Sequence, residues 1–314
     1  MSIVAQAGPR ERMIPVEKAR TRCPICDRPD FCLIAPDGSK AICMRVDDGG
    51  KLVDMGSLGE GWLYVLDGSL QAAQDRPQVP SRPRPEPADR DTLHRAYSAI
   101  LGALALSDEH RQGLHGRGLT DDARIDAIGL RTLPTRGRAR VAAAALEALG
   151  GDLEAALRVP GLFQRRDGDR AWLTLGGSPG LLIPTRDTRG RILCLQVRRD
   201  EPGPGGCRYQ FLTSTGDERG NGPGPVQGAH VPRHETRPEV LRLTEGPLKA
   251  EVSTYLSGIL TIAAPGVGAW RLLLPVLEEL RPARVLVAID VDFRTNPRVA
   301  RDLRDLVAAI LEAA

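Results

Sequence analysis

The chain has 314 residues, of which 41% are hydrophobic and 26% are charged, and its formal net charge is +3. This length allows two or three domains with one sizeable core, and so small a net charge does not by itself indicate a polyanionic partner. No apolar run approaches the roughly 20 residues of a membrane span, and the N-terminus lacks the apolar segment of a signal peptide. We therefore expect a cytoplasmic protein without membrane contact, whose six cysteines are reduced.

Four of these cysteines lie close together in a first module, residues 1–66: Cys23, Cys26, Cys32 and Cys43. The Cys-x2-Cys spacing of the first pair lets two thiolates share one tetrahedral ion. With the second pair they complete a closed four-thiolate site, which predicts a structural Zn²⁺ in a zinc-ribbon-like module. The alternative is that Cys32 and Cys43 are small buried core residues. Cys194 and Cys207 are expected to be ordinary thiols.

The segment that follows, residues 67–90, is rich in proline and charge, which predicts an extended linker. In residues 91–238 we expect a helix capped by Asp91 or Thr92, then two short helices around a glycine break. Turn-separated strands come next: RAWLTL, GLLIPTRD, RILCLQVRR and CRYQFLT. Four arginines between Arg131 and Arg140 form either a solvated face or a track for a phosphate backbone.

Strands and helices alternate in residues 239–314. The strands VLRLTE, ILTIAA and RVLVAID, each followed by a helical pattern, predict a parallel sheet with helices on both faces. Glu245 ends the first of these strands, and Asp290 and Asp292 end the third on one face. Because the carboxyl ends of parallel strands meet at one edge, these acids either form a cluster that needs a divalent cation or act separately as helix caps and solvated turns. A cation held there would support phosphoryl or nucleotidyl transfer.

The stretches "LTEGPLKAEV" and "VAIDVDFRTNPRVA" resemble the Toprim domain of bacterial primases, topoisomerases and some nucleases. The resemblance implies that Glu245, Asp290 and Asp292 are the catalytic acids and hold Mg²⁺ or Mn²⁺. Lys249 stands where many relatives have an acid, so it either contacts a phosphate or covers the helix surface. "TNP" replaces a glycine usual after the two aspartates. The sequence stops one helix later, so the last strand of a complete Toprim sheet is expected to be missing.

The order of zinc module, linker and Toprim-like domain resembles bacterial-type primases. Because no histidine lies near the cysteines, the likeness is closer to the primase-like proteins of phages and mobile elements. In residues 91–238, "HRQGLHGRGLTDDARIDAIGLRTLP", "GLLIPTRDTRGRILCLQVRR" and "CRYQFLTSTG" resemble the basic α+β subdomain that precedes Toprim in primases. That resemblance implies contact with template phosphates or the nucleotide for four residues: Arg198, Arg199, Arg208 and Tyr209.

We therefore expect a DNA primase-like nucleotidyltransferase that binds single-stranded DNA and nucleoside triphosphates and makes short primers. A Toprim-like α/β domain (239–314) would carry the chemistry, after a primase-type α+β subdomain (91–238). No Walker phosphate loop is present, so any replicative helicase would be a separate chain. Two alternatives remain open: a Toprim nuclease or topoisomerase-like enzyme that cleaves phosphodiesters, and a non-catalytic DNA-binding replication accessory.

Overall fold

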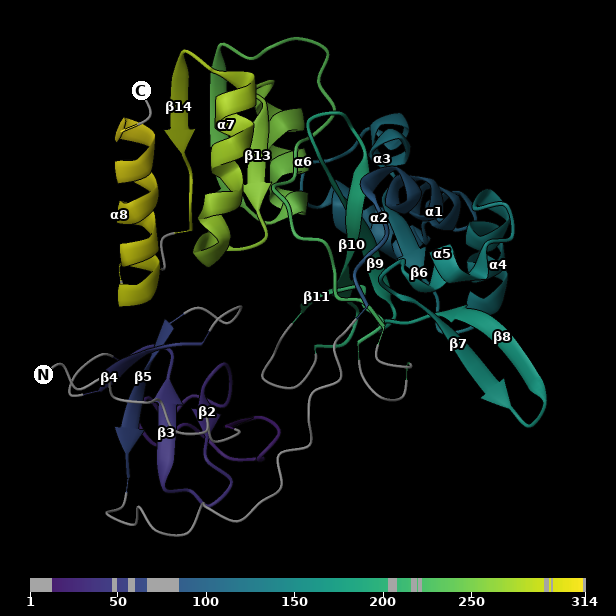
Figure 1. The fold of residues 1–314 in the computed structure, drawn as a ribbon. Coiled ribbons are helices and arrows are strands. Elements are labelled where there is room, and N and C mark those ends of the chain that lie inside the picture. Colours follow the sequence, from purple (N-terminus) through teal and green to yellow (C-terminus); the bar gives the residue numbers. More distant parts are fainter. Residues whose placement is uncertain are drawn as a thin grey trace, which may run out of the picture. The chain divides into compact units, whose positions relative to one another are not determined.

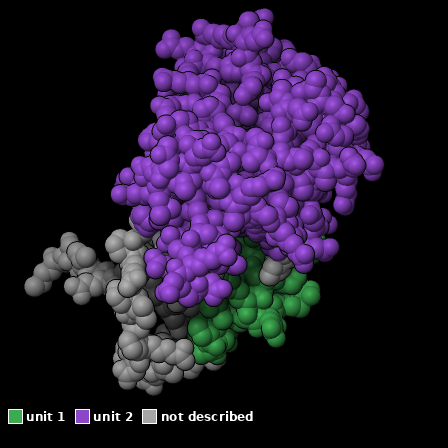
Figure 2. Space-filling model, turned by 90° about the vertical axis from the view of Figure 1, so that its right-hand side faces the viewer, with its two compact units in different colours: residues 1–81, 202–207, 292–301 green, residues 82–201, 208–291, 302–314 purple. Residues whose placement is uncertain are grey.

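The chain forms two compact units, which Figure 2 shows in different colours. Unit 1 comprises Met1–Ser81, Pro202–Cys207 and Asp292–Arg301, and unit 2 comprises Arg82–Glu201, Arg208–Val291 and Asp302–Ala314. The computed structural model describes residues 13–46, 50–55, 60–66, 85–202, 208–215, 219, 222–290, 294 and 296–312. Most of the expected linker, residues 67–84, and Cys207 lie outside the described residues. No described helix is both long and apolar enough to cross a membrane.

Unit 1 contains a five-stranded sheet in which every neighbouring pair of strands is antiparallel (Figure 1). In sheet order the strands are β1 (Ile14–Pro15), β2 (Leu33–Ile34), β3 (Lys40–Cys43), β5 (Glu60–Val65) and β4 (Lys51–Asp54). The strands are short and the core is small. Three of its seven fully buried members are cysteines, namely Cys23, Cys32 and Cys43.

Unit 2 begins with helices: α1 (Arg90–Gly102), α2 (Asp108–His115), α3 (Asp122–Ile128), α4 (Arg138–Ala148) and α5 (Leu153–Leu157). The expected cap of α1 at Asp91 or Thr92 is wrong. The Asp89 carboxylate accepts the backbone N–H groups of both residues, and this cap satisfies donors that the first helical turn leaves unpaired. The two short helices expected around the glycine break are confirmed as α2 and α3.

An antiparallel sheet with the order β11-β10-β9-β6 packs against these helices. Its strands are β6 (Arg131–Leu133), β9 (Gly180–Arg186), β10 (Ile192–Arg199) and β11 (Tyr209–Phe211). A separate hairpin joins β7 (Leu162–Asp167) to β8 (Arg170–Leu175). At Gly180 the backbone of β9 comes so close to β10 that a Cβ atom would collide with the carbonyl oxygen of Arg198, which explains the glycine.

The last part of unit 2 contains a three-stranded parallel sheet with the order β13-β12-β14. Its elements are β12 (Val240–Glu245), α6 (Pro247–Ser257), β13 (Thr261–Ala264), η4 (Val267–Leu273), α7 (Leu274–Leu280) and β14 (Arg284–Val287). Helix α8 (Pro297–Glu312) belongs to unit 2 from Asp302 onward. Leu241 and Leu243 of β12 point into a core shared with η4, α7 and α8. Arg242, on the other face of the strand, donates a hydrogen bond to Ser257 of α6. Helices therefore pack against both faces, as expected.

Two expected boundaries in this sheet are wrong. The third strand ends at Val287 and not at Asp290, because its ladder with β12 closes where the N–H of Ala288 donates to the carbonyl of Leu243. The segment read as a glycine turn followed by a helix forms a 3-10 helix, η4, before α7 begins. Pro275 lies in the first turn of α7, where a missing N–H leaves no intrahelical hydrogen bond unmade.

Candidate functional site

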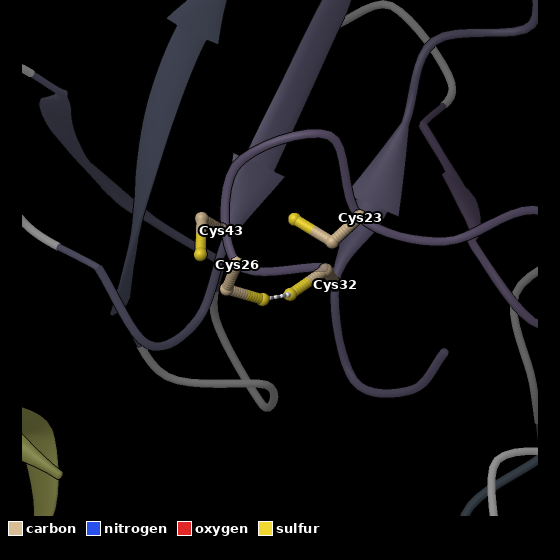
Figure 3. Close-up of side chains that lie close together, drawn as sticks. All are labelled: Cys23, Cys26, Cys32 and Cys43. Carbon is tan, nitrogen blue, oxygen red and sulfur yellow. Dashed lines mark hydrogen bonds between the residues drawn. The ribbon is translucent and has the colours of Figure 1, made fainter. Parts of the chain in front are cut away.

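The four predicted zinc ligands converge in unit 1. The sulfur atoms of Cys23, Cys26, Cys32 and Cys43 point toward a common centre (Figure 3) and lie within 4.8 Å of one another. Those of Cys26 and Cys32 are 3.7 Å apart. Zinc–sulfur bonds of about 2.3 Å in a tetrahedral site place sulfurs about 3.8 Å apart. The arrangement is therefore compatible with a four-cysteine structural zinc site, and it includes Cys32 despite its irregular spacing in the sequence.

Hydrogen-bond donors surround the sulfur atoms. The N–H of Met44 donates to Cys32 Sγ at 3.5 Å, and the N–H of Val46 donates to Cys43 Sγ at 3.3 Å. The guanidinium of Arg45 lies 3.6 Å from Cys32 Sγ, and an ion pair of 2.7 Å with Asp30 holds it in place. Such outer contacts orient the ligands of a metal site and offset the negative charge of four thiolates.

Because the four thiols lie so close together, their pKa values shift in different directions. A hydrogen bond from Cys32 lowers the pKa of Cys43 to about 5, while the same hydrogen bond and burial raise the pKa of Cys32. Burial also raises the pKa of Cys23. Some of the thiols thus hold protons in the absence of metal. A divalent ion that binds all four displaces these protons, which couples metal affinity to pH.

The second predicted site lies at the carboxyl edge of the parallel sheet in unit 2. Glu245 is the last residue of β12, and Gly246 follows with φ near +80°, a backbone conformation that favours glycine and that turns the chain directly into α6. Asp290 follows β14, which is hydrogen-bonded to β12. Asp292 lies outside the described residues.

Lys249, in the first turns of α6, lies between the two acids. Its Nζ is 2.5 Å from Asp290 Oδ2 and 3.4 Å from Glu245 Oε1. The two roles expected from the sequence, contact with a phosphate or cover of the helix surface, stay predictions for this side chain. It forms ion pairs with both acids and supplies the positive charge that the acidic edge requires.

Each member of this group affects the protonation of the others. Burial raises the pKa of Glu245, and the nearby Asp290 adds to this, while Lys249 opposes it. The hydrogen bond from Lys249 lowers the pKa of Asp290. Burial alone would lower the pKa of Lys249, but the two carboxylates outweigh it and raise that pKa. Of the two acids, Glu245 is therefore the one that takes up a proton more readily.

The two carboxylates of this group fit a hard divalent cation, whereas Lys249 competes with such a cation for them. Two carboxylates from adjacent strands are the oxygen ligands that Mg²⁺ prefers. The ammonium group of Lys249 already contacts both, however, so a cation bound to Glu245 and Asp290 must share them with Lys249 or displace it. Because Lys249 and Asp290 are largely exposed, with 45% and 58% of their side-chain surfaces accessible, such a rearrangement requires no change in the core.

The predicted nucleic-acid-binding residues of the central sheet also come together. Arg198 of β10 lies directly opposite Tyr209 of β11, and the N–H of Arg199 donates to the carbonyl of Arg208 at 2.7 Å. Three arginines and a tyrosine thus cluster where these two strands end. Cross-strand partners share a face of the sheet, so Arg198 and Tyr209 lie on one face.

Sequence reasoning missed a buried acid that anchors α6. Glu251 is 1% exposed, and its Oε1 lies 3.2 Å from His230 Nε2. Its other oxygen lies 3.5 Å from a guanidinium nitrogen of Arg124 in α3. The backbone N–H of Arg186 donates to His230 Nδ1 at 3.1 Å, so the imidazole donates from Nε2 to Glu251. Glu251 comes three residues after the buried Leu248, at helical spacing, and this signal could have revealed a buried carboxylate.

No protein-family model and no curated protein match the chain. Among solved structures it is similar to the DnaG primase catalytic domain bound to single-stranded DNA (20% identity, TM-score 0.45, 71% of this chain, 66% of that one). It is also similar to a DNA primase domain from Pseudomonas aeruginosa (19% identity, TM-score 0.46, 68% of this chain, 66% of that one). A third similar structure is the Aquifex aeolicus primase with its zinc-binding and RNA polymerase domains (17% identity, TM-score 0.42, 64% of this chain, 49% of that one). The chain thus matches two thirds or less of the length of each, and we base the proposed function on the chain's own side chains.

Proposed function

We propose that this chain is a primase-like nucleotidyltransferase with a Toprim-like site, which binds single-stranded DNA and joins nucleotides into short primers. The observation that carries the proposal is the pairing of Glu245 and Asp290 at the carboxyl edge of a parallel sheet, directly beside Lys249. In α/β sheets this edge is where ligands bind. The four-cysteine module supports the same proposal, because its geometry is compatible with a structural zinc site that would stabilise a template-binding module.

Each of these residues has its own role in the proposed reaction. Asp290 and Asp292, with Glu245, would hold Mg²⁺ or Mn²⁺, and such an ion would supply positive charge for the phosphates and the attacking oxygen. Glu245 would accept the proton of the attacking 3′-hydroxyl, whose oxygen would bond to the α-phosphorus of the nucleoside triphosphate as pyrophosphate leaves. Asp290 stays ionised. Phosphates of the template or of the nucleoside triphosphate would contact three arginines and a neighbouring tyrosine: Arg198, Arg199, Arg208 and Tyr209.

We place this activity in the replication of a phage or mobile element in the cytoplasm, with any replicative helicase supplied by a separate chain. The zinc module and the arginine cluster hold the template strand. Arginine suits this role because its planar guanidinium donates two parallel hydrogen bonds to one phosphate.

A second candidate function is a non-catalytic DNA-binding accessory. The observation that favours it is the ion pairing of Lys249 with both acids, which satisfies the acidic edge without a metal. In that case Glu245, Lys249 and Asp290 have a purely structural role, and nucleic-acid binding resides in the arginine cluster alone.

The test of the proposed function is primer synthesis by the purified chain with single-stranded DNA, nucleoside triphosphates and Mg²⁺. We expect short oligomers from the wild type and a loss of at least about a thousandfold, or about 4 kcal/mol in the barrier, in Asp290→Asn plus Asp292→Asn. The control removes two exposed acids of α7 and α8, with Glu278→Gln plus Asp305→Asn, and should leave synthesis unchanged. Strand scission without synthesis would indicate a nuclease. DNA binding with no turnover in the wild type would support the accessory function.

We further expect Lys249→Met to bind divalent cations more tightly. The substitution removes a positive charge that contacts both acids, so Mn²⁺ affinity, measured by electron paramagnetic resonance, should rise about tenfold, equivalent to about 1.4 kcal/mol. Lys249→Arg keeps the charge and should bind Mn²⁺ as the wild type does. Equal affinities of wild type and Lys249→Met would show that the acids are not the metal site.

A further inference from the structure

The hairpin formed by β7 and β8 has an outer half that the core does not explain. Its base packs into the main core of unit 2 through the buried side chains of Leu162, Leu173 and Leu175. From Arg165 to Arg170 every residue is exposed. In Figure 1 the two strands extend away from the rest of unit 2. An isolated two-stranded ribbon adds little stability. Because the side chains of this half also pack against no core, they are free to contact a ligand.

The register of the hairpin gives its two faces different chemistry. Arg165 lies opposite Trp172, and Asp167 lies opposite Arg170, so these four side chains share one face. Arg166 lies on the other face, where it donates a hydrogen bond to Gln164. On the first face the Arg170 guanidinium lies 5.8 Å from the centre of the Trp172 ring, within reach of a cation–π contact.

A third cation is close enough to Arg165 for their charges to interact. Arg138, at the start of α4, is fixed by hydrogen bonds to the carbonyls of Pro134 and Gly177. Burial lowers its pKa, and the positive charges of Arg219 and Arg165 lower it further. In the part of the chain that the structure describes, no ion pair involves Arg138, Arg165 or Arg170. Asp167 shares this face but forms no ion pair with these arginines, so an excess of positive charge remains, an arrangement that an anionic ligand relieves.

We propose that this face of the hairpin, with Arg138, Arg165, Arg170 and Trp172, is a second binding surface for single-stranded nucleic acid. The nature of the ligand rests on the proposed function, but the surface itself rests on the hairpin's own side chains. The arginines contact phosphates along the strand, while the partly exposed indole of Trp172 stacks with an unpaired base. Alternating cations and an aromatic platform are how proteins hold single strands without reading sequence.

The aromatic ring decides between possible polyanions. An acidic peptide would need only the charges, and the bases of a duplex are already stacked on one another. A single strand alone offers free base faces to Trp172 together with phosphates to the arginines. The same surface thus favours the unpaired template that leads to or from the site of synthesis.

The decisive comparison is Arg165→Glu against Arg166→Glu in the full chain. The two residues are adjacent, and the charge change is identical, but only Arg165 lies on the proposed face. With a fluorescein-labelled oligothymidylate, we expect Arg165→Glu to weaken binding about tenfold and to reduce the slope of log affinity against log salt by about one, since one phosphate contact is lost. Arg166→Glu should weaken binding less than about threefold. Equal losses in the two variants would overturn the proposal.

Trp172 provides an independent measurement. Trp172→Ala should weaken oligothymidylate binding about tenfold with an unchanged salt slope, because stacking releases no counterions. Binding should also quench the tryptophan fluorescence of the wild type but not that of Trp172→Phe, as Trp62 and Trp270 are buried. Quenching that survives in Trp172→Phe, or displacement of the strand by polyglutamate at equal charge concentration, would overturn the assignment to nucleic acid.

These outcomes are separate from the test of primer synthesis. A wild type that synthesises primers while Arg165→Glu binds normally would refute the hairpin surface and leave the nucleotidyltransferase intact. A wild type that makes no primers, with binding that depends on Arg165 and Trp172, would refute the enzyme and retain the surface.

Discussion

Removal of zinc should unfold the cysteine module of unit 1. Its core is small, and three of its seven buried members are cysteines that converge on the proposed ion. Binding of the ion therefore supplies most of the stabilisation that so small a core cannot provide. Structural zinc contributes about 10–16 kcal/mol in small domains of this kind. We expect about one zinc per chain by mass spectrometry. We also expect rapid amide hydrogen exchange in β2 and β3 once a chelator has removed the metal.

The corresponding substitution is Cys32→Ser, with Cys194→Ala as its control. Cys32 is the ligand whose place in the sequence is least regular, and its Sγ receives an N–H from Met44. Cys194 is equally buried, with a pKa raised to about 12 by burial, but it belongs to β10 of unit 2. Zinc content should fall to near zero in the first variant and stay near one in the second. Zinc-free wild-type protein that keeps its slow exchange in β2 and β3 would contradict the assignment.

How much of each site the sequence predicts depends on the range of the interactions involved. The convergence of Cys23 and Cys26 follows from a local turn, and the sequence predicts it well. The pairing of Glu245 with Asp290 follows from the adjacency of two parallel strands, which the strand–helix alternation already indicates. Both predictions need only backbone topology, and topology is what hydrophobic periodicity encodes.

The position of Lys249 could not be predicted in this way. Its ion pairs with Glu245 and Asp290 depend on the conformation of a long side chain and on the end of β14, three residues earlier than the sequence pattern indicates. Likewise, the charged face of the β7–β8 hairpin depends on the pairing of Arg165 with Trp172. A shift of one residue in that register would move Arg165 to the opposite face, and the register is set by the two-residue loop Gly168–Asp169, which hydrophobic periodicity does not reveal.

The buried acid of α6 links these features, because α6 carries Lys249 and directly follows Glu245. The position of α6 is fixed by Glu251, which contacts His230 and Arg124. His230 in turn accepts the backbone N–H of Arg186 at the end of β9. The acidic edge of the parallel sheet is thus tied through one carboxylate to the antiparallel sheet and to α3.

Replacement of this carboxylate should therefore destabilise unit 2 strongly. Glu251→Ala leaves the Nε2–H of the buried His230 and the partly exposed guanidinium of Arg124 without their partner, and an unsatisfied buried donor costs about 1–3 kcal/mol. Urea denaturation followed by circular dichroism at the helical band measures this loss, because helices α1 to α7 all lie in unit 2. Glu251→Gln keeps an oxygen that can accept from His230 but loses the charge, so its loss should be intermediate.

The control is Glu278→Ala, which removes an exposed carboxylate from α7 of the same sheet. Surface changes of this kind shift stability by less than about 0.5 kcal/mol. If Glu251→Ala unfolds at the same urea concentration as Glu278→Ala, the network does not anchor α6. If instead Glu251→Gln matches the wild type while Glu251→Ala does not, the hydrogen bond to His230 carries the anchor and the pairing with Arg124 contributes nothing.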